Sequence, residues 1–528
     1  QGFFHWELDF ATVFGRGGFD LQLGNPPWVR PQADVDALLA EGDPWWQLSP
    51  KPSEAERVAR MEETLALPGV RELVLAGTVD LIGLREYAGG RMNYPHLEGL
   101  QPDLYRCFMS QVWRHGSSRG ISALIHPESH FTEERAGHLR SVTYRRLRRH
   151  WHFINELKLF EIQDQKTFGI NVYGCHRSPC FMHAASLYHP DTVLRSFDHD
   201  GSGPEPGIKH KGEWDLRPHR ARLQRVDIDV LRVWADILET GDAVPEESRM
   251  VYTVNSTATA VLRQMAKSRR IRELGFSFSR GWDESIDRQA GRFVRDWGEA
   301  PWPDAILQGP HLYVSTPLAK APNPTMKHQQ DWTGVDLEVL APDALPVTSY
   351  KPAGSRAEYD ARYTHWGDNG EIPARDHYRV AWRAMAANTG ERTLISALIP
   401  PGATHVHTVT SLGTESPETL VHIVGAMSSL LSDFAVRSAP KSAITPDTIR
   451  RLPFNARDPH LLRWLRLRSL QLNCLTDAYA QLWEKCWDDS FLDDHAILHR
   501  HRPGIVTREW SADVPLRRAV DRRNAQVE

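Results

Sequence analysis

The chain has 528 residues, of which 41% are hydrophobic and 25% are charged, a composition typical of a globular protein with roughly two to four domains. Its 63 basic and 67 acidic residues give a net charge of −4, which excludes a uniformly basic nucleic-acid-binding protein. Five cysteines do not suggest a disulfide scaffold, and no apolar run is long enough for a membrane span. We therefore expect reduced thiols inside a cell, and nucleic-acid contacts only where basic residues cluster.

Residues 1–30 are predicted to form a short helix or turn and then a strand that ends in a rigid turn. Phe19, Leu21 and Leu23 alternate with polar residues, as a strand requires. Gly24 permits a turn, and the two prolines that follow fix φ and remove two N–H donors.

The turn itself, Asn25-Pro26-Pro27-Trp28, combines groups that suit a planar ligand with an exocyclic amino group. The Asn25 amide oxygen and the Pro26 carbonyl are two acceptors for the N–H groups of such an amine. The indole of Trp28 offers a flat face on which the ring would stack. The alternative is a proline-rich turn whose tryptophan packs in the core.

Alternating strands and helices follow, which predicts an α/β sheet. Residues 31–90 have an acidic, helical pattern. We then expect helices over residues 103–109 and 132–150, and strands over residues 120–125, 154–160 and 167–173, the last two as a hairpin. Arg145, Arg148 and Arg149 at the end of the second helix are candidate phosphate contacts, with a solvated basic face as the alternative. The spacing of the Cys and His residues at 175–183 does not match a zinc site, and no metal is expected.

The remainder divides into three parts by composition. Residues 198–249 have the polar, turn-rich pattern of a linker followed by a helix, residues 250–455 have short strands between Pro- and Gly-rich turns, and residues 456–528 have a helical pattern. Arg392 is expected to be structural, because it begins a core strand. Candidate DNA contacts in the middle part, each of which is alternatively a surface charge, are Arg280, Arg288, Arg292, Lys320, Lys327, Arg379 and Arg383.

Two blocks of sequence carry a resemblance to a known family. The tetrapeptide at residues 25–28, with the frame at residues 4–20, resembles the catalytic motif of S-adenosylmethionine-dependent amino-methyltransferases, chiefly DNA adenine-N6 methyltransferases. The nearest branch contains the large methylases of type IIG restriction–modification, BREX and DISARM systems. Residues 391–402 resemble a conserved segment of the target-recognition domain of the same methylases.

The resemblance implies a fold and a function. Residues 1–197 would form the catalytic half of a Rossmann-like class I methyltransferase sheet, and residues 250–455 an α+β target-recognition domain before the helical C-terminal region. Double-stranded DNA in a prokaryotic cytoplasm would be the partner, with the adenine flipped out of the duplex. Phe168 would form the second wall of the base pocket, with packing in the sheet as the alternative. Asp20 is a weaker candidate for supporting the turn or the cofactor, with a hydrogen bond at the strand end as the alternative.

The sequence does not show the Gly-rich loop, between a strand and a helix, with which the family binds its cofactor. The glycines at residues 15–18 enter the catalytic strand and do not link a strand to a helix, so we interpret them as a turn. The half that binds S-adenosylmethionine is therefore expected on a missing N-terminal part or on another defence-system subunit. Two alternatives remain: a non-catalytic DNA-binding specificity or scaffold subunit, and an amino-methyltransferase that acts on protein or RNA.

Overall fold

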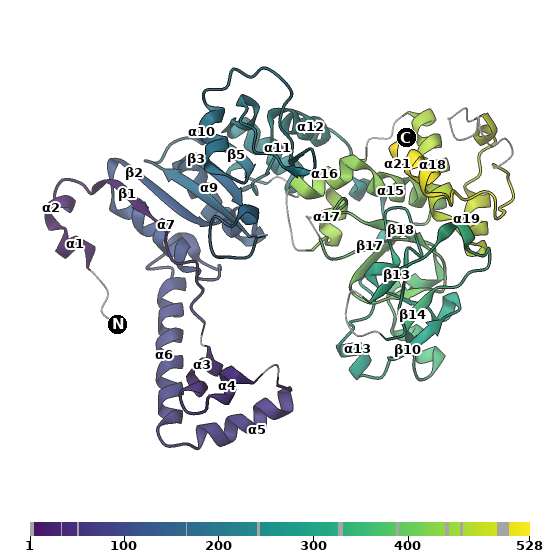
Figure 1. Cartoon of the computed structure of the whole chain (residues 1–528), viewed down its shortest axis with the longest axis horizontal. Helices are drawn as coiled ribbons and strands as arrows, with labels where there is room; N and C mark the ends of the chain where they lie inside the picture. Colours follow the sequence, from purple (N-terminus) through teal and green to yellow (C-terminus); the bar gives the residue numbers. More distant parts are fainter. Residues whose placement is uncertain are drawn as a thin grey trace. The chain divides into compact units, whose positions relative to one another are not determined.

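The computed structural model of the chain folds into two compact units, Gln1–Arg263 and Gln264–Glu528 (Figure 1). The residues that the structure describes are 5–32, 34–49, 52–164, 166–239, 243–325, 331–386, 390–438, 443–454, 458–493 and 506–528.

The first unit is built on a six-stranded mixed sheet with the strand order β1-β2-β4-β3-β5-β8. The pairs β1–β2 and β3–β5 are parallel, and the other three pairs are antiparallel. The strand β1 therefore lies at one edge of the sheet. The strands are β1 (Phe19–Gly24), β2 (Gly116–Pro127), β3 (Leu147–Ile154), β4 (Thr167–Tyr173), β5 (Cys180–Leu187) and β8 (Gln224–Asp227).

Helices pack beside this sheet, and α7 (Leu104–His115) leads directly into β2. Asp103 precedes α7 without capping it, because its carboxylate is engaged by the guanidinium of Arg30 at 2.6 Å. The other elements around the sheet are α1 (Trp6–Asp9), α2 (Ala11–Phe14), α8 (Ser129–Thr132), α9 (Gly137–Arg146), α10 (Pro190–Ser196), β6 (Lys209–His210), β7 (Glu213–Trp214), α11 (Ile228–Leu238) and α12 (Ser256–Ala266).

A helical arm is inserted between β1 and α7. It comprises α3 (Val35–Ala40), α4 (Trp45–Leu48), α5 (Glu54–Leu65) and α6 (Val70–Gly89), and Figure 1 shows α6 leading from α5 back toward the sheet. A small core of Leu39, Trp46 and Val70 holds the arm together. The arm is closed at its base, where the N–H of Leu104 donates to the carbonyl of Val29 at 3.0 Å.

The prediction of one helix over residues 132–150 is wrong in its second half. The helix α9 ends at Arg146, and residues 147–154 form β3, while the strand expected over residues 154–160 is absent. The reason is tertiary: β3 lies between β4 and β5, so pairing on both sides outweighs the helical preference of its arginines.

The second unit contains a four-stranded antiparallel sheet with the order β18-β17-β20-β9. Its strands are β9 (Ser277–Ser279), β17 (Arg379–Arg383), β18 (Ser396–Ile399) and β20 (Val409–Gly413). Short pairs accompany it: β10 (Phe293–Glu299) with β14 (Val347–Pro352), β11 (Ile306–Leu307) with β19 (Thr404–His405), β12 (Lys320–Pro322) with β13 (Trp332–Gly334), and β15 (His365–Trp366) with β16 (Ile372–Pro373).

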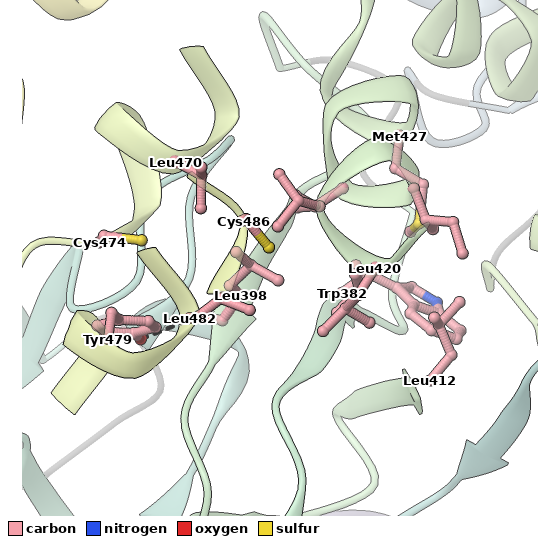
Figure 2. Close-up of a cluster of buried hydrophobic side chains, with 14 of the residues drawn as sticks. Trp382, Leu398, Leu412, Leu420, Met427, Leu470, Cys474, Tyr479, Leu482 and Cys486 are labelled. Atoms are coloured by element: carbon pink, nitrogen blue, oxygen red, sulfur yellow. Dashed lines mark hydrogen bonds between the residues drawn. The ribbon is translucent and has the colours of Figure 1, made fainter. Parts of the chain in front are cut away.

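Helices cover this sheet and share a core with it. In Figure 2, Trp382, Leu398 and Leu412 of the sheet lie beside Leu420 of one helix and Leu470 of another, and all five are buried. The helices of the unit are α13 (Ile286–Gln289), α14 (Arg356–Arg362), α15 (Pro417–Ser428), α16 (Leu430–Ser438), α17 (Pro446–Arg451), α18 (Pro459–Asn473), α19 (Ala480–Lys485) and α21 (Ala519–Val527).

The segment that begins at Arg392 is anchored by a buried carboxylate. Asp433 accepts the main-chain N–H groups of Thr393 and Leu394, both at 2.7 Å. Arg392 donates to the carbonyl of Ser428 at 2.5 Å. These contacts place Arg392 in a structural position, as its place before a core strand predicts.

Within the described ranges, no single helix has both the length and the apolar character of a membrane span, and α15 with α16 meets those criteria only as a pair bent by 60°.

Candidate functional site

The turn Asn25-Pro26-Pro27-Trp28 lies where β1 ends. Gly24, the last residue of β1, is in register with Leu124 of the parallel strand β2, so the carboxyl ends of both strands meet beside the turn. Ligands of open α/β sheets bind outside the carboxyl ends of the strands. The turn therefore occupies the edge of the sheet at which a ligand is expected.

The turn is anchored by its tryptophan and open at its asparagine. Trp28 is partly buried, its Nε1–H donates to the carbonyl of Ile125 at 3.2 Å, and its ring lies 5.7 Å from that of Phe160. Asn25 is exposed, and its amide has no hydrogen-bond partner among the residues that the structure describes. This arrangement leaves an acceptor and a donor available to a ligand on a fixed backbone.

Phe168 does not form the second wall of an open pocket, which corrects the prediction. Its side chain is 2% exposed and is stacked on Phe153, with ring centroids 5.4 Å apart. The ring centroid of Trp28 lies 6.0 Å from that of Phe168. Because Phe168 belongs to the core under the turn, it supports the indole and has no free face for a base.

Phe160 is the aromatic residue that sequence reasoning missed. It is partly buried beside Trp28, in a loop held by the fully buried Asn155. The Asn155 amide donates to the carbonyls of Phe160 and Ile162, each at 3.0 Å, and accepts the N–H of Phe160 at 3.0 Å. An asparagine directly after a strand was the available signal, because its side chain often fixes a turn.

Asp20 and the glycines before it lie at the opposite end of β1. The Asp20 carboxylate is exposed and accepts the hydroxyl of Ser117 at 2.9 Å. Gly17 and Gly18 have φ of 97° and 112°, and a Cβ at Gly18 would lie 2.5 Å from the carbonyl oxygen of His115. Gly18 is thus required for close packing against α7, and this turn does not fit a cradle for S-adenosylmethionine.

The candidate arginines at the end of α9 and the start of β3 are mostly engaged within the protein. Arg145 pairs with Glu246 at 2.9 Å, and Arg148 donates to the carbonyls of Arg146, Leu147 and Cys175. Arg149 is exposed and lies over the ring of Phe197. Arg149 therefore retains the best access to a phosphate among the three predicted contacts.

The structure contradicts the prediction that Arg379, in the second unit, contacts DNA. It is fully buried in β17, where it donates to the hydroxyl of Tyr363 at 3.3 Å and to the carbonyl of Ala403. Arg383 on the same strand donates to the carbonyls of Gly309 and Leu312 at 2.9 and 3.0 Å. Arg379 is therefore shielded from a phosphate, whereas Arg383 is partly buried and is engaged with main-chain carbonyls.

The other candidates differ in their access to solvent. Arg292 pairs with Asp287 and lies over the ring of Trp282. The exposed candidates are Arg280, Arg288 and Lys320, while Lys327 falls outside the residues that the structure describes.

A buried polar cluster lies directly after β2, near the turn, and sequence reasoning missed it. The carboxylate of Glu128 is bonded to His150 Nε2 and receives the hydroxyl of Tyr252, both at 2.8 Å, and His150 in turn meets His183 at 2.8 Å. Burial raises the pKa of Glu128 and lowers that of His150 to about 3. Gly169 makes room for it, because a Cβ there would lie 2.0 Å from Glu128 Oε1.

The comparisons with known proteins are weak. No protein-family profile and no curated protein matches the chain. Similar solved structures include the type IIG restriction endonuclease BpuSI (11% identity, TM-score 0.27, 89% of this chain and 52% of that chain) and the type IIL restriction-modification enzyme MmeI in complex with DNA (9%, 0.33, 96% and 53%). The DrdV–DNA complex is a third (11%, 0.34, 88% and 45%).

The chain thus spans about half the length of these structures. By their descriptions, BpuSI is a restriction endonuclease and MmeI is a restriction-modification enzyme. At TM-scores below 0.5, the likeness does not define a shared activity, and the function rests on the residues of the chain itself.

Proposed function

We propose that the chain carries the base-binding side of a DNA adenine-N6 methyltransferase in a restriction–modification or phage-defence system. One observation carries the proposal: the exposed, unpartnered amide of Asn25 lies at the carboxyl end of an edge strand, on a turn fixed by Trp28. The motif in which this amide occurs resembles the catalytic motif of amino-methyltransferases of the BREX, DISARM and type IIG branch.

The chemistry assigned to the turn is hydrogen-bond acceptance. The Asn25 amide oxygen and the Pro26 carbonyl would accept the two N–H groups of the adenine amine. As the amine nitrogen becomes a nucleophile, positive charge develops on it, and these two acceptors stabilise that charge without a general base. Flipping the base costs a few kcal/mol, and stacking on the exposed part of Trp28 returns about 1–3 kcal/mol.

The methyl group would come from S-adenosylmethionine bound by other residues, since the glycine turn before β1 does not fit the cofactor. The described part of the chain leaves the outer edge of β1 unpaired, and Leu21 and Leu23 on that strand are 60% and 72% exposed. These features support a cofactor-binding half that packs against β1, supplied by an N-terminal part of the protein or by another subunit.

Recognition of the DNA sequence is assigned to the second unit, which contains the segment at residues 391–402. Arg280, Arg288 and Lys320 are its exposed basic candidates. They remain candidates for phosphate or base contacts, because a charged side chain at the surface carries no sequence information alone.

The test uses the native protein together with its cofactor-binding half, and measures methyl transfer from S-adenosylmethionine to duplex DNA. We expect Asn25→Ala to lower kcat by about 10²–10³, the usual loss when one stabilising hydrogen-bonding group is removed from a transition state. Asn369→Ala, which truncates another exposed asparagine, is the matched control. Normal methylation by Asn25→Ala would overturn the assignment.

Among the described residues, the Gly-rich turn before β1 packs against α7 and does not fit S-adenosylmethionine, which favours one second candidate, a non-catalytic DNA-binding subunit. Calorimetric titration of the complete protein, including any cofactor-binding half, with S-adenosylmethionine separates the two, because a scaffold subunit binds DNA but has no cofactor-binding half and contributes no Asn25 to a reaction. Methyl transfer to protein or RNA in place of DNA would identify an amino-methyltransferase with a different substrate.

A further inference from the structure

A hollow lies at the end of the first-unit sheet opposite the Asn25 turn. It has a volume of about 180 Å³ and lies where β2 begins and β4 ends. Its lining residues are Val112, Trp113, Gly116, Ser117, Ser118, Gly120, Ser122, Arg146, Tyr173, Gly174, Cys175 and His176. Since pockets for drug-sized ligands span about 300–1,000 Å³, this hollow suits one small group.

Arg146 is the distinctive member of this lining. Its guanidinium lies over the ring of Trp113, 5.5 Å from the ring centroid, and is partly buried. Within the part of the chain that the structure describes, it has neither a carboxylate partner nor a hydrogen-bonded acceptor, and its Nε is shielded from solvent. A shielded charge without a counter-ion is costly, so the site is electrostatically incomplete.

The surrounding groups favour a negative occupant. The Nε1–H of Trp113 is also buried without an acceptor, and the lining adds three serine hydroxyls but no carboxylate. Asp20 accepts the hydroxyl of Ser117 at 2.9 Å, but it is exposed and does not line the hollow. The guanidinium of Arg148 packs against Gly174, with its atoms about 3 Å from the position of a Cβ there, and adds positive charge.

We propose that this hollow binds a phosphate group, with Arg146 as its cation and Trp113 and the hydroxyls of Ser118 and Ser122 as further donors. Arginine suits this role because its planar fork of N–H groups matches the oxygens of a phosphate. The phosphate is either a free anion or one phosphate of a nucleic-acid backbone. The inference does not depend on the proposed methyltransferase activity, since the hollow and Asn25 lie at opposite ends of β1 and β2.

The test titrates the full chain with inorganic phosphate by calorimetry, at constant ionic strength and pH 7.5. We expect one binding event, weakened at least tenfold in Arg146→Gln and at least threefold in Trp113→Phe. The matched control is Arg195→Gln, which removes the same charge from an exposed position on α10 and should bind phosphate within twofold of the parent.

A second arm measures binding of duplex DNA at several salt concentrations. If the phosphate belongs to a nucleic-acid backbone, Arg146→Gln also weakens DNA binding and lowers the salt slope by about one. If the phosphate is a free anion, Arg146→Gln loses phosphate binding and retains DNA binding. The proposal is overturned if Arg146→Gln and Trp113→Phe both bind phosphate as the parent does, or if the parent binds no phosphate and all forms bind DNA equally.

Discussion

The indole N–H of Trp28 donates to the main-chain carbonyl of Ile125 across 3.2 Å, and this bond joins the turn after β1 to the last residues of β2. The bond ties the indole of Trp28 to the main chain of β2, and through that side chain it holds the turn beside the sheet. Asn25, three residues earlier on the same turn, is therefore also held in place relative to the sheet.

Replacing Trp28 by Phe removes this hydrogen bond but keeps an aromatic ring. We expect the free energy of unfolding to fall by about 1–3 kcal/mol, because the carbonyl of Ile125 loses its partner in a partly buried position. Chemical denaturation followed by far-UV circular dichroism measures the change. Phe14→Leu, which alters an aromatic residue at the other end of β1, provides a comparison; equal stability of Trp28→Phe and the parent would show that the bond does not fix the turn.

The polar cluster around Glu128 predicts that stability falls as the pH falls. Burial lowers the pKa of His126 to about 4 and that of His150 and His152 to about 3, whereas the unfolded chain protonates histidine near 6.5. Below pH 6.5, the unfolded state therefore binds more protons, and the free energy of unfolding decreases by up to about 1.4 kcal/mol per pH unit for each histidine.

Glu128 acts in the opposite direction, because burial raises its pKa and the folded state keeps a proton that the unfolded state releases above pH 4.5. Its contribution is lost as the pH rises, but several histidines outweigh one carboxyl between pH 4.5 and 6.5. Denaturant titrations at pH 7.5, 6.0 and 5.0 measure the slope, and His150→Gln should make it shallower. Constant stability over this range would contradict the prediction.

Asp433 anchors the segment that begins at Arg392, and its removal should destabilise the second unit. Asp433→Ala leaves the buried N–H groups of Thr393 and Leu394 without an acceptor, at about 1–3 kcal/mol for each. Asp447→Ala is the control, since Asp447 pairs with Arg450 at the surface and such pairs contribute less than about 1 kcal/mol. A similar loss of unfolding free energy in both variants would argue against the anchoring role.

Arg379 and Arg280 should behave differently in DNA binding, although both were candidates by residue type. Arg280→Gln removes an exposed charge, and we expect it to reduce the salt slope of DNA binding by about one if it contacts a phosphate. Arg379→Met should lower the melting temperature and leave that slope unchanged, because the side chain is fully buried. A smaller slope in Arg379→Met, measured on folded protein, would restore Arg379 as a contact.

Local pattern was sufficient for β1 and its turn, since alternating apolar residues followed by Gly24, Pro26 and Pro27 have few other conformations. It was insufficient for β3, whose arginines favour a helix until β4 and β5 pair with both edges of the strand. The parallel pairing of β1 with β2 also came only from the structure.

The chemical roles of single residues could not be predicted, because they depend on burial in the folded protein. Arg379 and Arg280 are alike as residue types, and only the position of Arg379 in a central strand assigns it to the core. The Glu128 cluster draws its members from β3, β5 and a segment near residue 252, so their proximity arises from the folded sheet. Phe168 was placed correctly on a strand, but its side chain faces inward.

The two ends of the helical arm are fastened together at its base, so the length of the arm does not affect the position of the Asn25 turn. The chain leaves at Val29 and Arg30 and returns at Asp103 and Leu104, where a main-chain hydrogen bond and an ion pair fasten the two ends together. Helices of other sizes can therefore be exchanged at this junction without moving Asn25, as a loop can be lengthened once its two ends are clamped. The size of the arm can thus vary while the chemistry beside it is retained.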